Sequence, residues 1–148
     1  MKREFEKRFI ISAPLATLQN MSKNKIVCVD FDGTCVTHEY PQIGADVPHA
    51  VSVLKKLNEN GVKLILWTIR SGEYLDEAAA WFAEREIEIW AVNKNPGQRF
   101  WSQSPKAYAP VYIDDAALGC PLQSLPDGTR PFADWFEIER LLREIDYL

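Results

Sequence analysis

Two carboxylates separated by one residue, Asp30 and Asp32, form the part of this sequence best suited to chemistry. They follow the apolar run 26–29, which is typical of a strand buried on both faces of a parallel sheet. Ligand sites in open parallel sheets gather at the carboxyl ends of the strands, so two acids at this point indicate a site. The sequence Asp-Gly-Thr at 32–34 occurs a second time at 127–129. A proline precedes this second copy and no strand leads into it, which favours a turn there.

Polar residues also follow two other apolar runs of the chain. Thr68 and Arg70 come after one of these runs, and Asp114 and Asp115 come after the other. Right-handed crossovers would bring the ends of all three predicted strands to one edge of the sheet. Clustered carboxylates repel one another unless a cation neutralises them, and oxygen ligands without nearby histidine or cysteine favour Mg²⁺. With Lys106, eight positions before Asp114, these residues could balance the charge of a phosphoryl group, bind its oxygens and attack its phosphorus.

The elements that would position these residues alternate between strands and helices. An acid and a proline at 46–48 predict the start of a helix whose apolar residues recur at helical spacing until Gly61. The further elements expected are a strand at 62–67, a helix at 73–85, a strand at 87–92, a polar connection at 93–105, a strand at 111–113 and a helix at 132–147. This alternation predicts an α/β fold, a three-layer doubly wound parallel sheet with helices on both faces.

Bulk composition allows an enzyme and restricts its partners. The 148 residues fit one domain, and a net charge of −4 argues against a general nucleic-acid binder. Three cysteines with no C-x-x-C spacing predict reduced thiols in a cytoplasmic protein. Residues 1–24 are expected to be an extension before a core at 25–148, because acids and a proline interrupt their likeness to a signal peptide. No stretch is long and apolar enough for a membrane span, so no membrane partner is expected.

The order of these motifs resembles that of the haloacid dehalogenase (HAD) superfamily in its phosphatase branch. Residues 27–34 match the first motif, Thr68 the second, Lys106 the third and residues 113–115 the fourth, so the resemblance covers residues 25–120. It implies a Rossmann-like HAD core. Receiver domains combine similar groups, but they place an acidic pair first and the phospho-acceptor later, which is the opposite order.

The resemblance implies a role for each matching residue. Asp30 would be the nucleophile that forms an aspartyl-phosphate, and Asp32 the general acid and then the base that activates water. Thr68 would donate a hydrogen bond to the phosphoryl group, and Lys106 would balance the charge on that group and on Asp30. Asp30 has to stay ionised while Asp32 holds a proton, so the two pKa values have to be pushed apart.

The same resemblance implies a Mg²⁺ site and a substrate site. Asp30, Asp114 and the backbone carbonyl of Asp32 would bind Mg²⁺, and Asp115 would bind it through water or orient the site. The residues expected beside the substrate phosphate are Gly33, Thr34, Ile69 and Arg70. For Arg70, a surface salt bridge is the alternative interpretation. His38 could touch substrate, although an ordinary loop histidine is the favoured interpretation.

The acid at Asp32 favours a phosphatase, since dehalogenases of the superfamily lack it. The connections 35–46 and 93–105 are too short for a cap domain, so an open site is expected. The expected function is therefore a Mg²⁺-dependent phosphomonoester hydrolase. A catalytically silent HAD-like phosphate- or metal-binding module is the alternative.

Sugar phosphates, nucleotides, phosphoproteins and nucleic-acid ends all remain open as substrates, with nucleic acid expected only as a substrate end. The oligomeric state is open too. Lys94, Arg99, Phe100 and Trp101 interleave bases with aromatics and could bind a nucleotide, although packing of the aromatic pair is the favoured interpretation.

Overall fold

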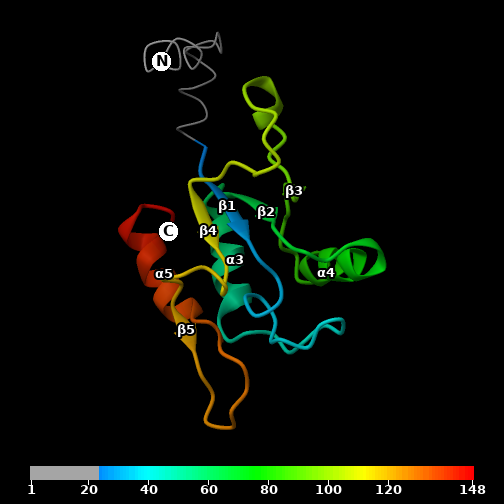
Figure 1. The fold of residues 1–148 in the computed structure, drawn as a ribbon. Helices are drawn as coiled ribbons and strands as arrows, with labels where there is room; N and C mark the ends of the chain where they lie inside the picture. Colours follow the sequence, from blue (N-terminus) through cyan, green and yellow to red (C-terminus); the bar gives the residue numbers. More distant parts are fainter. Residues whose placement is uncertain (1–23) are drawn as a thin grey trace, which may run out of the picture.

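A four-stranded parallel sheet forms the centre of the computed structural model, which describes residues 24–148 (Figure 1). The strands are β1 (Ile26–Val29), β2 (Lys63–Leu66), β3 (Ala91–Val92) and β4 (Val111–Ile113), in the order β3-β2-β1-β4. Neighbouring strands are all parallel, with Val29 beside both Leu66 and Ile113. The predicted α/β class and parallel sheet are confirmed. The predicted extension, apart from residue 24, lies outside the described residues.

The three α-helices of residues 24–148 contribute to one apolar cluster on one face of the sheet. They are α3 (Ala50–Glu59), α4 (Gly72–Glu84) and α5 (Trp135–Glu144). The strands add Val27, Val29 and Leu64 to this cluster, so their side chains point to the helical face. Two successive crossovers, β1 to β2 and β2 to β3, move the same way along the sheet. Because right-handed crossovers that move in one direction lie on one face, α3 and α4 pack on the same side.

The opposite face of the sheet is covered by a loop. Ile26, Cys28 and Ile65 form a second cluster with Ala107 and Ala109, which precede β4. The aromatic rings that pack against this cluster belong to Trp67, Trp90 and Tyr112. The connection from β3 to β4 runs back across the sheet and therefore passes over this face. Within residues 24–148 the second helical layer that we expected is not observed, since residues 93–110 take its place.

Several element boundaries differ from the prediction. Asp46 does not cap α3, which begins at Ala50. Its carboxylate instead accepts hydrogen bonds from Trp81 of α4 and from Arg85, the residue after α4. The predicted strand at 87–92 pairs in the sheet only over its last two residues. The polar connection after it contains a short 3₁₀ turn, η1 (Gln98–Phe100).

The predicted last helix is shorter because a small hairpin comes first. β5 (Leu122–Gln123) and β6 (Phe132–Ala133) pair antiparallel, and α5 starts only at Trp135. The second Asp-Gly-Thr lies in the connection between them, where Gly128 has a φ of 79°. The predicted turn at 127–129 is therefore confirmed.

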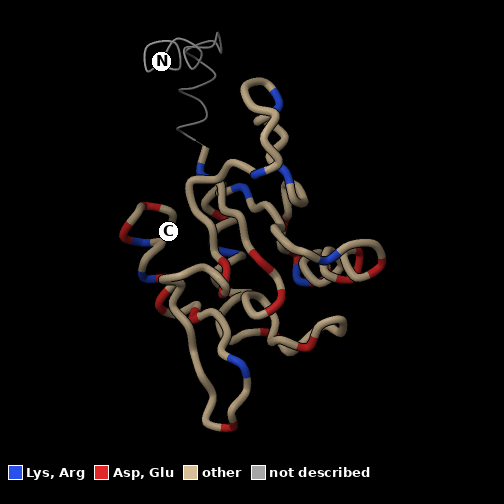
Figure 2. Tube along the Cα trace, in the orientation of Figure 1, with Lys and Arg blue, Asp and Glu red and all other residues tan. Residues whose placement is uncertain are grey.

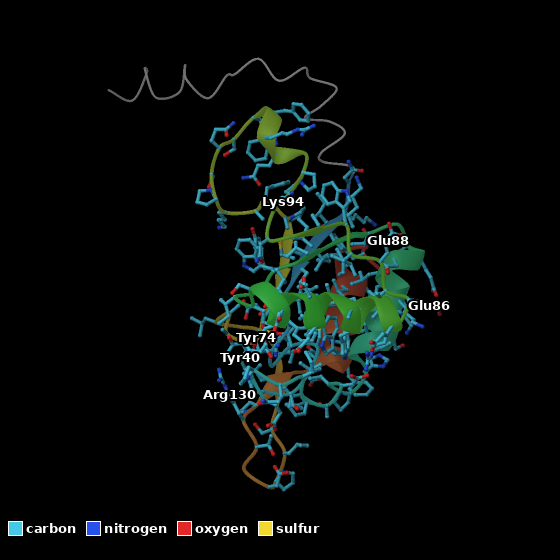
Figure 3. All side chains as sticks on the ribbon, turned by 90° about the vertical axis from the view of Figure 1, so that its right-hand side faces the viewer. Tyr40, Tyr74, Glu86, Glu88, Lys94 and Arg130 are labelled. Carbon is cyan, nitrogen blue, oxygen red and sulfur yellow. The ribbon has the colours of Figure 1, made fainter. Side chains whose placement is uncertain are left out.

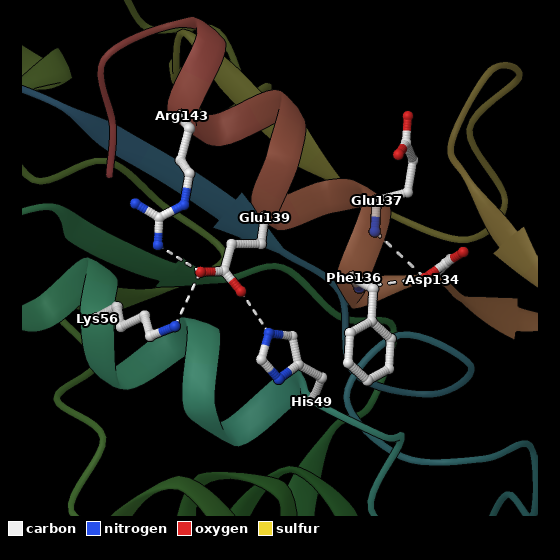
Figure 4. Close-up of polar contacts among 7 residues, drawn as sticks. All are labelled: His49, Lys56, Asp134, Phe136, Glu137, Glu139 and Arg143. Carbon is white, nitrogen blue, oxygen red and sulfur yellow. Dashed lines mark hydrogen bonds and ion pairs between the residues drawn. The ribbon is translucent and has the colours of Figure 1, made fainter.

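An ion cluster joins α5 to α3, as Figure 4 shows. Glu139 of α5 accepts hydrogen bonds from Lys56 of α3 at 2.8 Å and from Arg143 at 2.6 Å, and it also contacts His49. Lys56 is the main reason that the pKa of Glu139 falls to about 2, with His49 and Arg143 adding to the effect. The His49 ring stacks on Phe136. No helix in the described part of the chain has the length and apolar composition to cross a membrane.

Candidate functional site

Three aspartates meet where β1 and β4 end. Asp30 follows β1, Asp114 and Asp115 follow β4, and the two strands are neighbours in register, with the Asp30 N–H donating to the Ile113 carbonyl at 2.9 Å. One carboxylate oxygen from each aspartate lies within 4.8 Å of the other two. The sequence predicted a cluster of four carboxylates from the strand ends, Asp32 included. The structure brings Asp30, Asp114 and Asp115 together, whereas the Asp32 carboxylate is bound by Arg70.

The charges of this cluster fit a hard cation. The pKa of Asp30 is raised to about 8, mainly by burial, with the nearby charge of Asp114 and a contact with Asp115 adding to the effect and hydrogen bonds from Thr34 and the Phe31 N–H opposing it. Burial and neighbouring carboxylates raise the pKa because they disfavour the ionised form of Asp30 when no positive charge lies beside it. A divalent cation bound by oxygen ligands would supply that charge, so the donor set suits Mg²⁺.

Thr34 holds two of the aspartates in place. Its side chain is fully buried, and its hydroxyl oxygen lies 3.0 Å from Oδ2 of Asp30 and 3.2 Å from Oδ1 of Asp115. The same oxygen accepts a hydrogen bond from the Asp115 N–H at 3.1 Å. We expected Thr34 beside the substrate; the structure instead shows it positioning the carboxylates, because the hydroxyl is enclosed and fully engaged.

Gly33 leaves room for a histidine beside the cluster. His38 Nε2 lies 2.9 Å from Oδ2 of Asp115, and its side chain is 15% exposed. A Cβ on Gly33 would lie 2.0 Å from that nitrogen and 2.6 Å from the Asp115 oxygen, and its φ of 80° also favours glycine. Gly33 is therefore required for the approach of His38 to Asp115.

Arg70 binds the carboxylate of Asp32 rather than pointing into open solvent. Its Nε and Nη2 each donate to one oxygen of Asp32 at 2.7 Å, and the Arg70 side chain is 0% exposed. The remaining donors face the backbone carbonyls of Pro41, Gln42 and Tyr74. In place of the expected contact with substrate, or of a surface salt bridge, the structure shows a buried pair that uses all five N–H groups.

This pair also connects Asp32 to residues 35–46, which we call the flap. Pro41 and Gln42 belong to it, and the Tyr40 ring lies 5.1 Å from the Arg70 guanidinium carbon. Hydrogen bonding to Asp32 raises the pKa of Arg70. The carboxylate of Asp32 is thus bound by Arg70 and is not one of the three clustered carboxylates. The predicted role of its backbone carbonyl toward Mg²⁺ stays a prediction.

A pocket of about 390 Å³ opens beside Asp30 and Asp114. We call it the site pocket; its lining residues are Asp30, Trp67, Thr68, Ile69, Asn93, Pro105 and Asp114. Thr68 and Ile69 were predicted here, and Ile69 is 93% exposed. Thr68 accepts a hydrogen bond from the Arg70 N–H at 3.1 Å through its hydroxyl.

Asn93 fixes the backbone of Thr68. Its side-chain oxygen accepts from the Thr68 N–H at 2.8 Å, and its amide nitrogen donates to the Thr68 carbonyl at 2.9 Å. Sequence reasoning missed this residue, although its position directly after the predicted strand at 87–92 was the signal that could have revealed it. Asn93 has a φ of 52°, a conformation that asparagine tolerates better than most residues.

Lys106 lies close to the site pocket but does not reach its carboxylates. It follows Pro105, which lines the pocket, and its ammonium lies 5.7 Å from the centre of the Tyr112 ring. Tyr112 in turn packs on Trp67, another lining residue. Within residues 24–148 Lys106 forms no ion pair, so its predicted contact with Asp30 stays a prediction.

The aromatic residues near Lys106 are only partly explained by packing. Trp101 packs edge-on against Tyr108, with ring centres 5.5 Å apart, as the favoured interpretation requires. Phe100 is 68% exposed, with the Arg99 guanidinium 4.8 Å from its ring centre.

No protein-family model matches the chain, and no curated protein is significantly similar to it. Among solved structures, that of a conserved protein from Bacteroides thetaiotaomicron is similar to this chain. The two are 39% identical over 82% of this chain and 91% of that protein, with a TM-score of 0.67. The chain belongs to the same family as this conserved bacterial protein.

Proposed function

We propose that this chain is a Mg²⁺-dependent phosphomonoester hydrolase of the HAD type, with a core that lacks a cap domain. The single observation that supports this most is the meeting of Asp30, Asp114 and Asp115 within 4.8 Å, beside a pocket that Thr68 also lines. A half-buried carboxylate that can act as the nucleophile, a hard-cation site and a hydroxyl donor at one sheet edge are the groups that phosphoryl transfer requires.

In the proposed reaction, an oxygen of Asp30 attacks the phosphorus of the substrate, and the ester P–O bond breaks. Asp32 gives a proton to the leaving alcohol. Asp32 then takes a proton from water, which attacks the aspartyl-phosphate and releases inorganic phosphate while Asp30 is regenerated. Asp30, Asp114 and Asp115 would hold Mg²⁺, whose charge would offset that of the phosphoryl oxygens.

This reaction requires two side chains to move from their positions in the structure. Both oxygens of Asp32 accept hydrogen bonds from Arg70, so neither oxygen faces a leaving group in this arrangement. Lys106 has to leave the Tyr112 ring to approach Asp30. We infer that substrate binding displaces the flap and Arg70 together, because Arg70 is bound to both the flap and Asp32.

The binding of Asp32 by Arg70 and the position of Lys106 over Tyr112 favour the second candidate, a catalytically silent HAD-like module that binds Mg²⁺ and phosphate. If Asp32 never leaves Arg70 and Lys106 never leaves Tyr112, the carboxylates could still bind a cation. This module would then have no general acid.

Turnover of p-nitrophenyl phosphate with Mg²⁺ separates the two candidates. For the hydrolase we expect EDTA to stop turnover and Asp30→Asn to reduce it by roughly 10⁴-fold, with Asp76→Asn on the exposed surface of α4 as the control. In acid-quenched protein, mass spectrometry should find one phosphoryl group on Asp30. Turnover that survives both EDTA and Asp30→Asn would refute the mechanism. No turnover of this ester, of phosphorylated metabolites or of 3′- and 5′-phosphorylated oligonucleotides would favour the module.

A further inference from the structure

A second hollow, of about 510 Å³, adjoins the site pocket. We call it the loop pocket; it is lined by residues 93–96, 98, 99, 102–105 and 107, which all lie between β3 and β4. Asn93 and Pro105 line both pockets, so the two hollows are neighbours along a shared wall. A substrate whose phosphate lies beside Asp30 could therefore extend its leaving group into the loop pocket.

The loop pocket carries positive charge and no negative charge. Lys94 and Arg99 line it, and no aspartate or glutamate does. Both cations are exposed, and neither takes part in an ion pair within the part of the chain that the structure describes. Figure 2 shows basic residues on this loop at the top of the view, while the chain as a whole has a net charge of −4. A local cationic surface on an acidic protein favours binding of an anionic group.

Buried amides hold the loop pocket in shape. Gln98 donates to the carbonyls of Ser104 and Lys106 and accepts from the Tyr108 N–H at 2.7 Å. Asn95 donates to the Tyr108 carbonyl at 2.8 Å and accepts from the Gly97 N–H at 2.9 Å. Both side chains are less than 10% exposed. Because these bonds join the two sides of the loop, little ordering would be needed when a ligand binds.

Neutral donors complete this surface. Ser102, Gln103 and Ser104 line the same hollow and can donate hydrogen bonds to anionic oxygens. We propose that the loop pocket is a subsite for a second anionic group, a phosphate or a carboxylate, on the leaving part of a small phosphomonoester substrate. This inference rests on the proposed function, and it narrows the substrate class to small molecules with two anionic groups.

Matched pairs of substrates test the subsite. Short alkanediol bisphosphates of increasing chain length would be compared, each with the corresponding monophosphate, and kcat/KM measured with Mg²⁺. We expect the bisphosphate to be preferred by about 10-fold or more for at least one chain length, as charge-assisted hydrogen bonds to Lys94 and Arg99 would give. The ratio is taken within each protein, so that any general change in activity cancels.

The double variant Lys94→Gln/Arg99→Gln should bring this ratio to about 1. The control is Lys55→Gln/Arg130→Gln, which removes the same two charges elsewhere. Arg130 lies on the connection between β5 and β6, and Figure 3 shows it well below Lys94 in that view. Two outcomes would refute the subsite: an equal preference for the bisphosphate in both double variants, or no preference for it in the wild type at any chain length.

A binding measurement keeps this result separate from that of the proposed function. Isothermal titration calorimetry of the Asp30→Asn protein with the same pairs requires no turnover. Tighter binding of the bisphosphate, lost in Asp30→Asn/Lys94→Gln/Arg99→Gln, would support the subsite even in a protein without phosphatase activity. Equal affinities at every chain length would refute it even if the enzyme hydrolyses p-nitrophenyl phosphate. A strong preference for phosphorylated oligonucleotides over all bisphosphates would also refute the small-molecule class.

Discussion

Arg70 and Asp32 face each other as a bidentate pair, with both carboxylate oxygens 2.7 Å from guanidinium nitrogens. Arg70 is the one charged residue that is buried as a whole among residues 24–148. It joins the end of β2 to the turn after β1 and to the flap, so one side chain connects three segments of the site.

Loss of this pair should destabilise the protein strongly. We expect Arg70→Ala to lower the free energy of unfolding by about 3–5 kcal/mol, because Asp32 and the flap carbonyls would lose a buried partner. Arg85→Ala is the control, since Arg85 binds Asp46 in the same two-point manner but its side chain is 28% exposed. Its cost should be about 1 kcal/mol or less. Urea unfolding measures the free energy of unfolding of both variants. An equal loss in Arg70→Ala and Arg85→Ala would contradict the structural role of Arg70.

Mg²⁺ should stabilise the folded protein through the three clustered aspartates. At a Mg²⁺ concentration 100 times the dissociation constant, the gain would be about 2.7 kcal/mol, seen as a higher thermal midpoint. Asp30→Asn and Asp114→Asn should reduce this gain, and Asp76→Asn should keep it. If Mg²⁺ stabilised all of these variants equally, the cation would have to bind at another site.

Lys106 should affect turnover more than stability. Lys106→Gln is expected to lower kcat by roughly 10²–10³-fold, because a positive charge beside the phosphoryl group would be lost in the transition state. Lys63→Gln is the matched control, since the Lys63 ammonium also lies over an aromatic ring, 4.5 Å from the centre of Trp90. An unchanged kcat in Lys106→Gln would mean that this lysine stays with Tyr112.

Glu139 should make stability depend on pH in the acid range. Its folded-state pKa of about 2 lies below the ordinary value of 4.5, so its contribution is present above about pH 4.5 and is lost as pH falls toward 2. Glu139→Gln should cost roughly 1–2 kcal/mol at pH 7, since Lys56 and Arg143 are partly exposed and solvent weakens the pairs. This cost should vanish near pH 2. Glu144→Gln, on the exposed side of α5, should show a smaller effect, and a pH-independent cost for Glu139→Gln would contradict the pairing.

Gly33 should tolerate no side chain. Gly33→Ala would place its Cβ 2.0 Å from His38 and 2.6 Å from Asp115, and would also strain a residue with φ of 80°. Gly61→Ala has a similar φ of 74° but meets nothing within 4 Å, so it measures the strain alone. We expect Gly33→Ala to be the less stable of the two and to bind Mg²⁺ more weakly in calorimetry. Equal stability and affinity would show that His38 and Asp115 move aside at little cost.

The strands that carry the site were predictable because their signal is local. Aspartates follow the apolar runs at 26–29 and 111–113, and both runs are strands in the structure with the predicted bounds. The placement of the loop over one sheet face was not predictable in this way. The polarity of residues 93–105 gives no helical period, and only the order of the strands decides which face the connection crosses.

The partners of individual side chains were decided by the tertiary structure. The sequence by itself determined that Asp30, Asp114 and Asp115 would meet, since parallel strands end at one edge of a sheet, but it also placed the carboxylate of Asp32 in that cluster. It did not determine that Arg70 would bind Asp32, that Thr34 would join two carboxylates, or that Lys106 would lie over Tyr112. Those contacts depend on distances between residues far apart in the chain, which are set only when the flap, the helices and the loop pack around the sheet.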